Sequence, residues 1–393
     1  MSRPGRVADY GRQIDRPGLL DFAPRLKSAL VSRFQRRLLG AFGRLTPGSA
    51  PARAFARGAR RAVGGFLYSL KVEINNRCPL SCRICYVRKG TTELSLSACR
   101  ELCRSLRSCG VRFEILGGEP LLHPDLAAII RSAKTEAVSP FISMYTNGSL
   151  ATAGLCSEIR AAGLDAAIVS LVSHREAVHD ACAGHPGTWA AAVEGIRRLS
   201  EAGLRVFTFT PILRDNLADV PDIREFVKDR LRASALFYQY IPRSRDDELN
   251  ITPEDWGRVK RWLAARDSGH WDFVRRFDML SGNSCSGGNF VLTVKADGSV
   301  QPCPFVDDVP MGSITEEDIW SIYKRRFRDE RFREFKRLPP ECGECSHRSV
   351  CGGGCRAAAR FFGGYGRRDP KCPGPASRPI TTAGFMDCVP TFF

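Results

Sequence analysis

Three cysteines at residues 78–85 constrain this chain more than any other feature of its sequence. Cys78, Cys82 and Cys85 form a Cys-x₃-Cys-x₂-Cys array directly after a short apolar run at residues 66–74. Three thiolates this close together on one loop favour a metal centre over a packed core. They are one short of the four that usually close an iron–sulfur cluster or a structural zinc site. An iron without a protein ligand leaves a position where a substrate can bind.

The composition is that of a large globular protein with metal-binding cysteines. The chain has 393 residues, of which 43% are hydrophobic and 26% charged, enough for two or three domains with a substantial core. Its sixteen cysteines fall in tight clusters, whereas disulfide frameworks belong mainly to small secreted domains. The chain has no run of about 18 apolar residues and no apolar core of a secretory signal, so we expect a cytoplasmic protein.

The net charge is concentrated at the N-terminus. Residues 1–64 contain fourteen Arg or Lys and three Asp, which accounts for +11 of the total +17. We expect residues 1–65 to form a basic, partly disordered extension with an amphipathic helix at residues 21–45. Such a helix packs on the main domain, lies on an anionic membrane surface or grips an acidic partner. Nucleic acid is a weaker candidate, because no recognition motif accompanies the charge.

From about residue 66 onward, short apolar runs alternate with helical patterns. The expected strands are residues 68–74, 111–116, 141–145, 166–172, 204–210 and 235–241. The expected helices are residues 95–108, 124–135, 152–162, 188–202, 218–231 and 251–263. This alternation predicts an α/β fold with a parallel sheet wound by right-handed βαβ units. Functional residues should then lie at the C-terminal ends of the strands.

Further motifs do follow the expected strands. Gly117-Gly118-Glu119-Pro120 follows the second strand, Thr146-Asn147-Gly148 ends the third, and Ser170 ends the fourth. The two glycines allow close backbone approach to a ligand, and Glu119 supplies an acceptor for a cationic group. Together with the cysteine array, these motifs resemble those of the radical S-adenosylmethionine (radical SAM) enzymes. The resemblance implies a partial (β/α)₆ barrel, which we expect at residues 66–270.

The resemblance also implies a cofactor set. Cys78, Cys82 and Cys85 would hold a 4Fe–4S cluster whose open iron chelates S-adenosylmethionine, and an electron from the cluster would cleave it to a 5′-deoxyadenosyl radical. A reductant such as flavodoxin or ferredoxin is the implied partner. The residues implied to bind S-adenosylmethionine are Gly117, Gly118, Glu119, Pro120, Thr146, Asn147 and Ser170. The chain departs from the family at Val172, where relatives carry an acid, and at Ile84, where many carry an aromatic residue.

Histidines are the other candidates for metal or acid–base chemistry in this part of the chain. His123, His174, His179 and His185 have no ligand spacing to a cysteine. We expect them to be structural or exposed to solvent.

A second group of cysteines begins at residue 285. Cys285 and Cys303 flank Gly298 in the pattern Cys-x₁₂-Gly-x₄-Cys, around an expected hairpin with its turn at Asp297-Gly298. The pattern Cys-x₂-Cys-x₅-Cys-x₃-Cys begins at residue 342, and Cys372 follows. A zinc ribbon would account for any two pairs. All seven together resemble the SPASM domain of radical SAM enzymes, an α+β iron–sulfur domain that we expect at residues 271–393.

The SPASM resemblance implies two auxiliary 4Fe–4S clusters. Carried over by position, the ligands of the first are Cys285, Cys303 and Cys355, and those of the second are Cys342, Cys345, Cys351 and Cys372. The first cluster then lacks a fourth cysteine, so its last iron is open to substrate or held by a different group. Cys388 is a spare cysteine near the end of the chain.

The C-terminal motifs look closest to maturases of peptide-derived redox cofactors, of the pyrroloquinoline quinone and mycofactocin type. The resemblance implies hydrogen abstraction from an unactivated carbon of a ribosomal peptide, giving a cross-link, a desaturation or an oxidative decarboxylation. Residues 1–64 do not resemble a winged-helix leader-binding module, so a separate partner would supply one. Pro304 stands where sulfatase-maturing dehydrogenases carry Asp, which disfavours that subtype unless Asp307 or Asp308 acts as base.

Two other functions stay open. The first is the same radical chemistry on a small-molecule or lipid-linked substrate, with the protein docked at a membrane by residues 21–45. The second is a non-catalytic iron–sulfur electron carrier. Residues 117–120 argue against the second, since a carrier has no use for a cofactor pocket.

Overall fold

The computed structural model describes residues 67–266 and 285–375. The expected extension at residues 1–65 with its helix at 21–45, the domain boundary at residues 270 and 271, and Cys388 lie outside the described residues.

Within the described residues, one mixed sheet of nine strands runs through both halves of the chain. Its strand order is β6-β5-β4-β3-β2-β1-β7-β8-β9. The strands are β1 (Ser69–Glu73), β2 (Arg112–Leu116), β3 (Ile142–Thr146), β4 (Ala166–Ser170), β5 (Arg205–Ile212), β6 (Ser234–Gln239), β7 (Val291–Val294), β8 (Ser299–Gln301) and β9 (Gly312–Ser313). Strands β1 to β6 are parallel neighbours, as the alternating pattern predicted.

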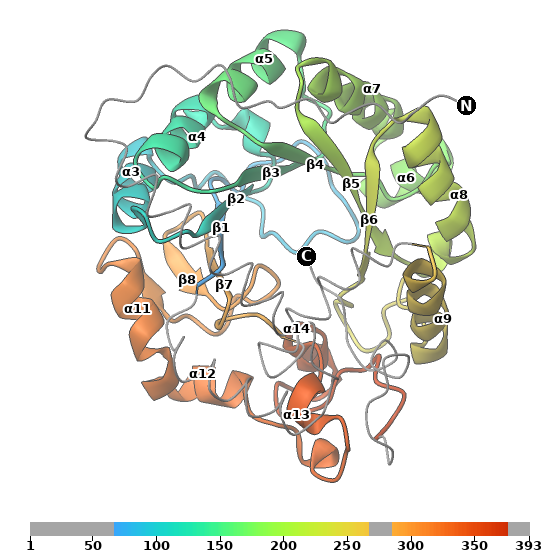
Figure 1. Cartoon of the computed structure of the whole chain (residues 1–393). Coiled ribbons are helices and arrows are strands. Elements are labelled where there is room, and N and C mark those ends of the chain that lie inside the picture. The colour runs from blue at the N-terminus through green and yellow to red at the C-terminus, as the bar shows by residue number, and fades with distance from the viewer. Residues whose placement is uncertain (1–66, 267–284, 376–393) are drawn as a thin grey trace, which may run out of the picture.

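Helices cover the outside of the partial ring formed by β1 to β6 (Figure 1). They are α3 (Leu96–Ser105), α4 (Leu126–Thr135), α5 (Ala153–Ala162), α6 (Glu176–Ala183), α7 (Thr188–Glu201), α8 (Val220–Glu225) and α9 (Pro253–Ala264). A π-helical turn at Phe226–Arg230 extends α8. The six expected strands and six expected helices are confirmed, with shifts of a few residues at their ends. Helix α6, between β4 and α7, was not predicted.

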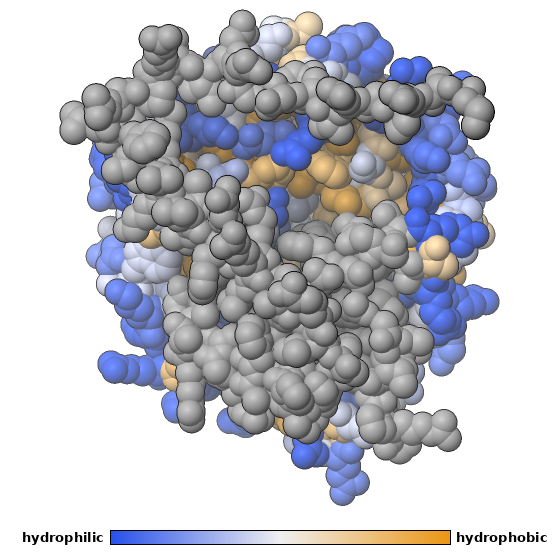
Figure 2. Space-filling view, in the orientation of Figure 1, coloured by the Kyte–Doolittle hydropathy of each residue, from blue (hydrophilic) through white to orange (hydrophobic). Residues whose placement is uncertain are grey.

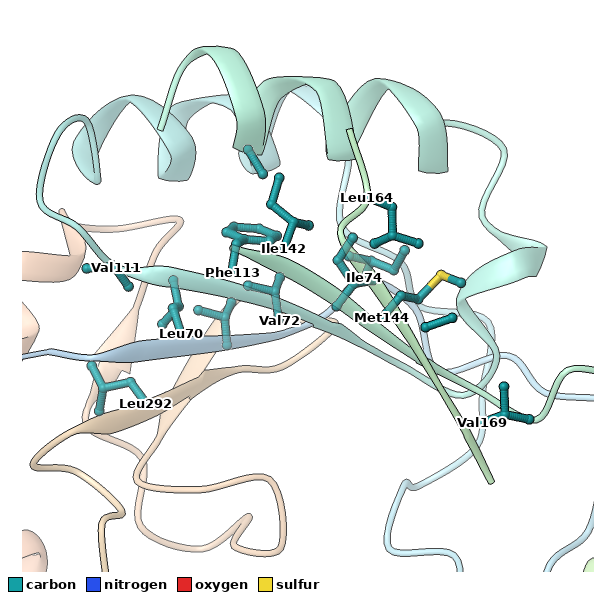
Figure 3. Packing of buried hydrophobic residues seen from close by; sticks show 14 of the residues in the cluster. Leu70, Val72, Ile74, Val111, Phe113, Ile142, Met144, Leu164, Val169 and Leu292 are labelled. Carbon is teal, nitrogen blue, oxygen red and sulfur yellow. The ribbon is translucent and has the colours of Figure 1, made fainter. Parts of the chain in front are cut away.

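The alternation of side chains along the strands separates an apolar layer from the inside of the barrel. Leu70 and Val72 of β1 are fully buried on the side that faces the helices. Figure 3 shows them packed with residues of the neighbouring strands. The labelled members of this layer are Leu70, Val72, Ile74, Val111, Phe113, Ile142, Met144, Leu164, Val169 and Leu292.

The opposite face of the strands carries polar and aromatic side chains. Lys71 Nζ lies 2.5 Å from Glu114 Oε2 on the neighbouring strand, and Tyr145 on β3 donates a hydrogen bond to the same oxygen at 3.3 Å. Phe209 and Tyr238 stack with 3.9 Å between their ring centroids. Charged groups are rare in protein interiors unless paired. The inside of this barrel is therefore built for polar contacts as well as for packing.

The C-terminal part continues the barrel sheet. Strand β7 pairs with β1 in parallel, with Ser69 opposite Val291. Strands β7 and β8 form the expected hairpin, and Gly298 in its turn has a φ of +85°. The helices that follow are α11 (Ile319–Arg325), α12 (Glu330–Phe335), α13 (Arg348–Cys351) and α14 (Arg356–Ala359). Orange and red in Figure 1, this part lies beside the ring at the β1 edge.

Figure 2 shows apolar residues gathered within the ring of strands and hydrophilic residues around its rim. No helix among the described residues is long and apolar enough to cross a membrane.

Candidate active site at the barrel mouth

The loop after β1 is fastened to helix α6. The backbone N–H of Arg83 donates to the carbonyl of Cys182 at 2.8 Å, and that of Ser81 donates to the carbonyl of Ala183 at 3.2 Å. Gly184 ends the helix with a φ of +73°, and a Cβ there would lie 2.7 Å from the carbonyl oxygen of Ser81. The helix that the sequence did not predict therefore positions the cysteine loop.

The cysteines of this loop are close enough to affect one another. Burial, together with repulsion from the thiols of Cys85 and Cys78, raises the pKa of the Cys82 thiol to about 11. No disulfide forms among the cysteines of the described residues. Nor do three Cys, His, Asp or Glu side chains there converge as tightly as the ligands of a single metal ion would.

The Gly117-Gly118 turn packs directly on the backbone of the cysteine loop. A Cβ on Gly118 would lie 2.1 Å from the carbonyl oxygen of Arg77, and a Cβ on Gly117 2.8 Å from that of Asn75. The N–H of Gly118 donates to the Asn75 carbonyl at 2.8 Å. The carbonyl oxygens of Gly117 and Gly118 accept no hydrogen bond from any described residue. Only glycine permits this approach, and it leaves backbone acceptors open.

The Glu119 carboxylate braces two loops. It is fully buried, and its Oε1 accepts hydrogen bonds from Thr146 Oγ1 at 2.6 Å and from the N–H of Leu121 at 3.1 Å. Its Oε2 accepts from the N–H of Asn147 at 2.8 Å. Burial raises the pKa of Glu119 and these three hydrogen bonds lower it, with burial prevailing. The sequence predicts Glu119 as an acceptor for a cationic group, and in the structure its carboxylate also accepts these three hydrogen bonds from within the protein.

The Thr146-Asn147-Gly148 motif after β3 contacts the first cysteine of the array. The Asn147 side-chain amide lies 3.8 Å from Cys78 Sγ, and its Oδ1 accepts from the N–H of Ser149 at 2.8 Å. Thr146 and Asn147 thus join the second-strand motif to the first cysteine, as their place after parallel strands predicted. Ser170 ends β4 with an exposed side chain and has no hydrogen bond to these residues.

The two departures from the family pattern occupy one apolar cluster. Val172 is buried with Cys182, Leu213, Tyr240 and Leu249, and Ile84 packs against this group. The two departures from the family pattern, Ile84 and Val172, are therefore apolar residues of one cluster. Their place in a common cluster could not be predicted from the sequence, because the two residues are far apart in the chain.

Four of the C-terminal cysteines meet around one space. Cys342, Cys345, Cys351 and Cys372 line one small common pocket. A common cavity lined by four thiols fits the ligand set of an iron–sulfur cluster. The assignment of these four residues to one site, carried over by position alone, is therefore supported by their arrangement.

Cys285, Cys303 and Cys355 form a separate group. Burial raises the pKa of Cys303 to about 12, and the Cys285 thiol contributes to the rise. Burial also raises the pKa of Cys355, with further increases from Asp369 and from the other two thiols. Asp369 is no free ligand, since its Oδ2 accepts the N–H of Cys355 and its Oδ1 that of Lys371, each at 2.8 Å. Among residues 67–266 and 285–375, this group has three thiols and no fourth cysteine, which fits a cluster with one position left for another group.

Asp307 and Asp308 are held by cations. Asp307 accepts from Arg360 at 2.8 Å and lies 2.8 Å from Arg88 Nη2. Burial raises the pKa of Asp307, but Arg360 and then Arg88 lower it below the ordinary value. Asp308 pairs with Arg360 at 3.1 Å and accepts a hydrogen bond from Tyr365. An ion-paired carboxylate is a poor general base, so neither residue replaces the Asp that Pro304 displaces.

The histidines serve the backbone. His123 Nε2 pairs with the Leu94 carbonyl at 2.9 Å, and its Nδ1 accepts from the N–H of Asp125 at 3.1 Å. His179 Nδ1 accepts from the N–H of Val172 at 3.2 Å, and His185 Nδ1 pairs with the Pro186 carbonyl at 2.8 Å. The His174 ring lies tilted against Phe226, with 6.5 Å between ring centroids. His123, His179 and His185 therefore make structural hydrogen bonds to the backbone.

Comparison with known proteins agrees with this geometry. The model of the Radical SAM superfamily matches residues 72–227, and the model of the SPASM iron–sulfur cluster-binding domain matches residues 285–346. The chain is a radical SAM enzyme with a SPASM domain. Its cofactors are therefore S-adenosylmethionine, a 4Fe–4S cluster and auxiliary iron–sulfur clusters.

Relatives of this radical SAM enzyme have several activities. An AdoMet-dependent heme synthase of Oleidesulfovibrio alaskensis is 27% identical over 340 residues, 76% of this chain and 85% of the relative. Mycofactocin maturase MftC of Mycobacterium ulcerans is 27% identical over 323 residues, 76% of this chain and 86% of the relative. The PqqA peptide cyclase of Gluconobacter oxydans is 25% identical, over 77% of this chain and 90% of the relative.

Solved structures share the fold. Streptococcus suis SuiB bound to S-adenosylmethionine has a TM-score of 0.65 and 15% identity, covering 83% of each chain. Native anSMEcpe with bound AdoMet has a TM-score of 0.62 and 17% identity, covering 78% of this chain and 94% of that one. These likenesses confirm the expected α/β barrel of the radical SAM type.

Proposed function

We propose that this radical SAM enzyme modifies an unactivated carbon of a ribosomal peptide, by cross-linking, desaturation or oxidative decarboxylation. The observation that carries the proposal is an open cavity between the two cysteine loops. Its lining includes Cys85 on one side and Pro304, the neighbour of Cys303, on the other. A substrate there would lie between a source of radicals and an acceptor of electrons.

In this proposal the radical SAM part spans residues 66–270, and Cys78, Cys82 and Cys85 hold its cluster. When bound, that cluster supplies the electron and the open iron position with which S-adenosylmethionine is cleaved to a 5′-deoxyadenosyl radical. The unpaired carbonyl oxygens of Gly117 and Gly118 accept hydrogen bonds from the methionyl ammonium. Glu119 holds these carbonyls in place through Thr146 and Asn147, and Pro120 and Ser170 complete the lining.

The SPASM part, at residues 271–393, receives the electron left on the substrate. Cys285, Cys303 and Cys355 form the nearer site, next to the cavity. The farther site consists of Cys342, Cys345, Cys351 and Cys372. A flavodoxin or ferredoxin supplies electrons from outside, since the chemistry begins with a reduction.

A peptide substrate is supported by the named activities of similar proteins. Two curated relatives are a mycofactocin maturase and a PqqA peptide cyclase. Streptococcus suis SuiB, with a TM-score of 0.64 and 15% identity, was solved bound to its precursor peptide SuiA. By this analogy, the substrate here is a peptide, delivered by a separate leader-binding protein.

A second candidate is a small-molecule substrate, including a haem precursor. Three relatives, 25–27% identical, are AdoMet-dependent heme synthases. Contact with a membrane surface through residues 21–45 belongs to this candidate. If deleting residues 1–64 leaves the distribution between vesicles and solution unchanged, the membrane contact is wrong.

The test is anaerobic reconstitution with iron and sulfide, followed by measurement of 5′-deoxyadenosine from S-adenosylmethionine under a strong reductant. We expect release from the native chain and from a Cys156→Ala control on α5, and no release from Cys78→Ala, which should keep its auxiliary clusters. No release from the native chain would favour the electron carrier. Mass spectrometry of peptides encoded beside the gene, looking for loss of two hydrogens or of carbon dioxide, then separates peptide from small-molecule substrates.

A further inference from the structure

The cavity between the cysteine loops has aromatic walls. Tyr86, from the first cysteine loop, packs on Phe305, from the loop after Cys303, with 4.8 Å between ring centroids. Tyr238 of β6 adds a third ring, itself stacked on Phe209. Aromatic walls built from both halves of the chain suit a substrate with an apolar or aromatic body.

The same cavity carries an excess of positive charge. The charged residues in its lining are Arg88, Arg243, Arg360 and Asp307, three cations and one anion. Asp307 is shared, since it pairs with both Arg88 and Arg360 at 2.8 Å. Arg360 also pairs with Asp308 at 3.1 Å, so two carboxylates balance the Arg88 and Arg360 guanidiniums, and the excess positive charge of the cavity comes from Arg243.

Arg243 has a guanidinium without a carboxylate partner in the described part of the chain. Its Nη1 donates to the carbonyl of Arg83 at 3.1 Å, which holds the side chain against the first cysteine loop. Asp247 contacts Arg243 only at the backbone N–H, at 2.8 Å, and also accepts the hydroxyl of Tyr240 at 2.8 Å. A guanidinium has five N–H donors in a planar fork, so Arg243 retains donors for a ligand.

We propose that this cavity binds a carboxylate of the substrate through Arg243, opposite a wall in which Arg88 and Arg360 are already paired with Asp307 and Asp308. The inference rests on the proposed function, because it places the substrate between Cys85 and Pro304. The ligand class is a carboxylate joined to an aromatic or apolar body, whether on a peptide or on a small molecule. The guanidinium fork matches a carboxylate with two parallel hydrogen bonds. Asp307 in the wall disfavours a doubly charged anion such as a phosphate monoester.

The first experiment is equilibrium dialysis of reconstituted holoenzyme, without oxygen and at low ionic strength, with N-acetyltyrosine and its neutral amide. A charge-assisted hydrogen bond contributes about 1.5–3 kcal/mol, so Arg243→Met should weaken binding of the acid about tenfold or more and leave the amide nearly unchanged. Arg214→Met is the matched control, because Arg214 is an exposed arginine whose side chain donates a hydrogen bond to the Asn250 carbonyl at 3.4 Å. Arg243→Lys should retain part of the preference, since it keeps the charge without the fork.

A second arm separates the two sources of the carboxylate. A tetracarboxylated porphyrin and its methyl ester are dialysed against the same proteins. The acid whose binding depends more strongly on Arg243, porphyrin or N-acetyltyrosine, identifies the source of the carboxylate.

An aryl phosphate that binds more tightly than N-acetyltyrosine would contradict the proposal. So would equal binding of acid and amide, or equal effects of Arg243→Met and Arg214→Met. Native enzyme that binds both equally yet releases 5′-deoxyadenosine would overturn this inference and leave the proposed function standing.

Discussion

The Lys295 ammonium forms a buried ion pair with the Glu73 carboxylate, with 2.7 Å between Nζ and Oε1. The two side chains are 14% and 4% exposed. The same ammonium donates to the carbonyl of Pro304 at 2.7 Å and lies 5.5 Å from the centre of the Tyr86 ring. One cation therefore connects the end of β1, the residue after Cys85 and the residue after Cys303. The spacing between the two cysteine loops depends on this pair.

Replacing Lys295 with Met should destabilise the protein. Removing one partner of a buried ion pair costs about 3–5 kcal/mol, because the other charge is left unpaired. Burial already raises the pKa of Glu73 and Lys295 lowers it, so without Lys295 the carboxyl becomes still harder to ionise. The free energy of unfolding of Lys295→Met, from urea denaturation, should therefore fall as the pH rises from about 5 to 7.5. Stability of Lys295→Met close to native at pH 7.5 would show that the pair is dispensable. Adding Glu73→Gln should restore much of the loss.

Replacing Gly118 with Ala should remove the first cluster selectively. The new Cβ would lie 2.1 Å from the Arg77 carbonyl, which forces the Gly-Gly turn away from the cysteine loop. We expect a loss of about four irons per chain, the content of one 4Fe–4S cluster, with the auxiliary clusters retained. Iron analysis and electron paramagnetic resonance measure this. Gly154→Ala on α5 is the control, since nothing lies within 4 Å of its Cβ position. A full iron complement in Gly118→Ala would mean that the loops can separate without harm.

Acid should weaken the anchor of the cysteine loop through His179. Burial lowers the pKa of His179 to about 4 from an ordinary value of 6.5. Between those values the unfolded chain binds a proton that the folded chain does not, so stability present above pH 6.5 is lost as the pH falls. From pH 7.5 to 5.5 this residue should lower the free energy of unfolding by about 1 kcal/mol. Urea denaturation at each pH measures it, and His179→Gln, which keeps an acceptor for Val172, should lack this component. Identical pH dependence of both proteins would refute the assignment.

Asp369→Asn should disturb both auxiliary sites. The Asp369 carboxylate accepts from Cys355 and Lys371 and from Gln239 at the end of β6, at 3.3 Å. In this variant the side-chain NH₂ of the new amide faces one of these N–H donors and cannot accept from it. The donor left unsatisfied destabilises the fold by about 1–3 kcal/mol. We expect lower iron and sulfide content in the auxiliary clusters and an intact first cluster. Asp229→Asn, at an exposed position, is the control. Selective loss from the first cluster instead would place Asp369 in a different role.

The sequence predicted the strands well, for a local reason. Apolar runs such as residues 68–74 reveal a buried strand by their length and composition, and cysteine spacing is itself the chemistry of a cluster site. Supporting contacts were not predictable in this way. The sequence predicts the Glu119 carboxylate as an acceptor for the cofactor, and only the fold shows that it also accepts hydrogen bonds from Thr146 and Asn147.

By itself, then, the sequence determined the radical SAM and SPASM assignment and the parallel barrel, and it predicts which cysteines belong together. Tertiary structure alone decided what holds those cysteines in place. Helix α6 supports the first loop through the carbonyls of Cys182 and Ala183, and Lys295 reaches Glu73 across more than two hundred residues. Ligand spacing is encoded within a few residues, whereas hydrogen bonds and ion pairs between distant segments exist only once the sheet has brought β1 and β7 together.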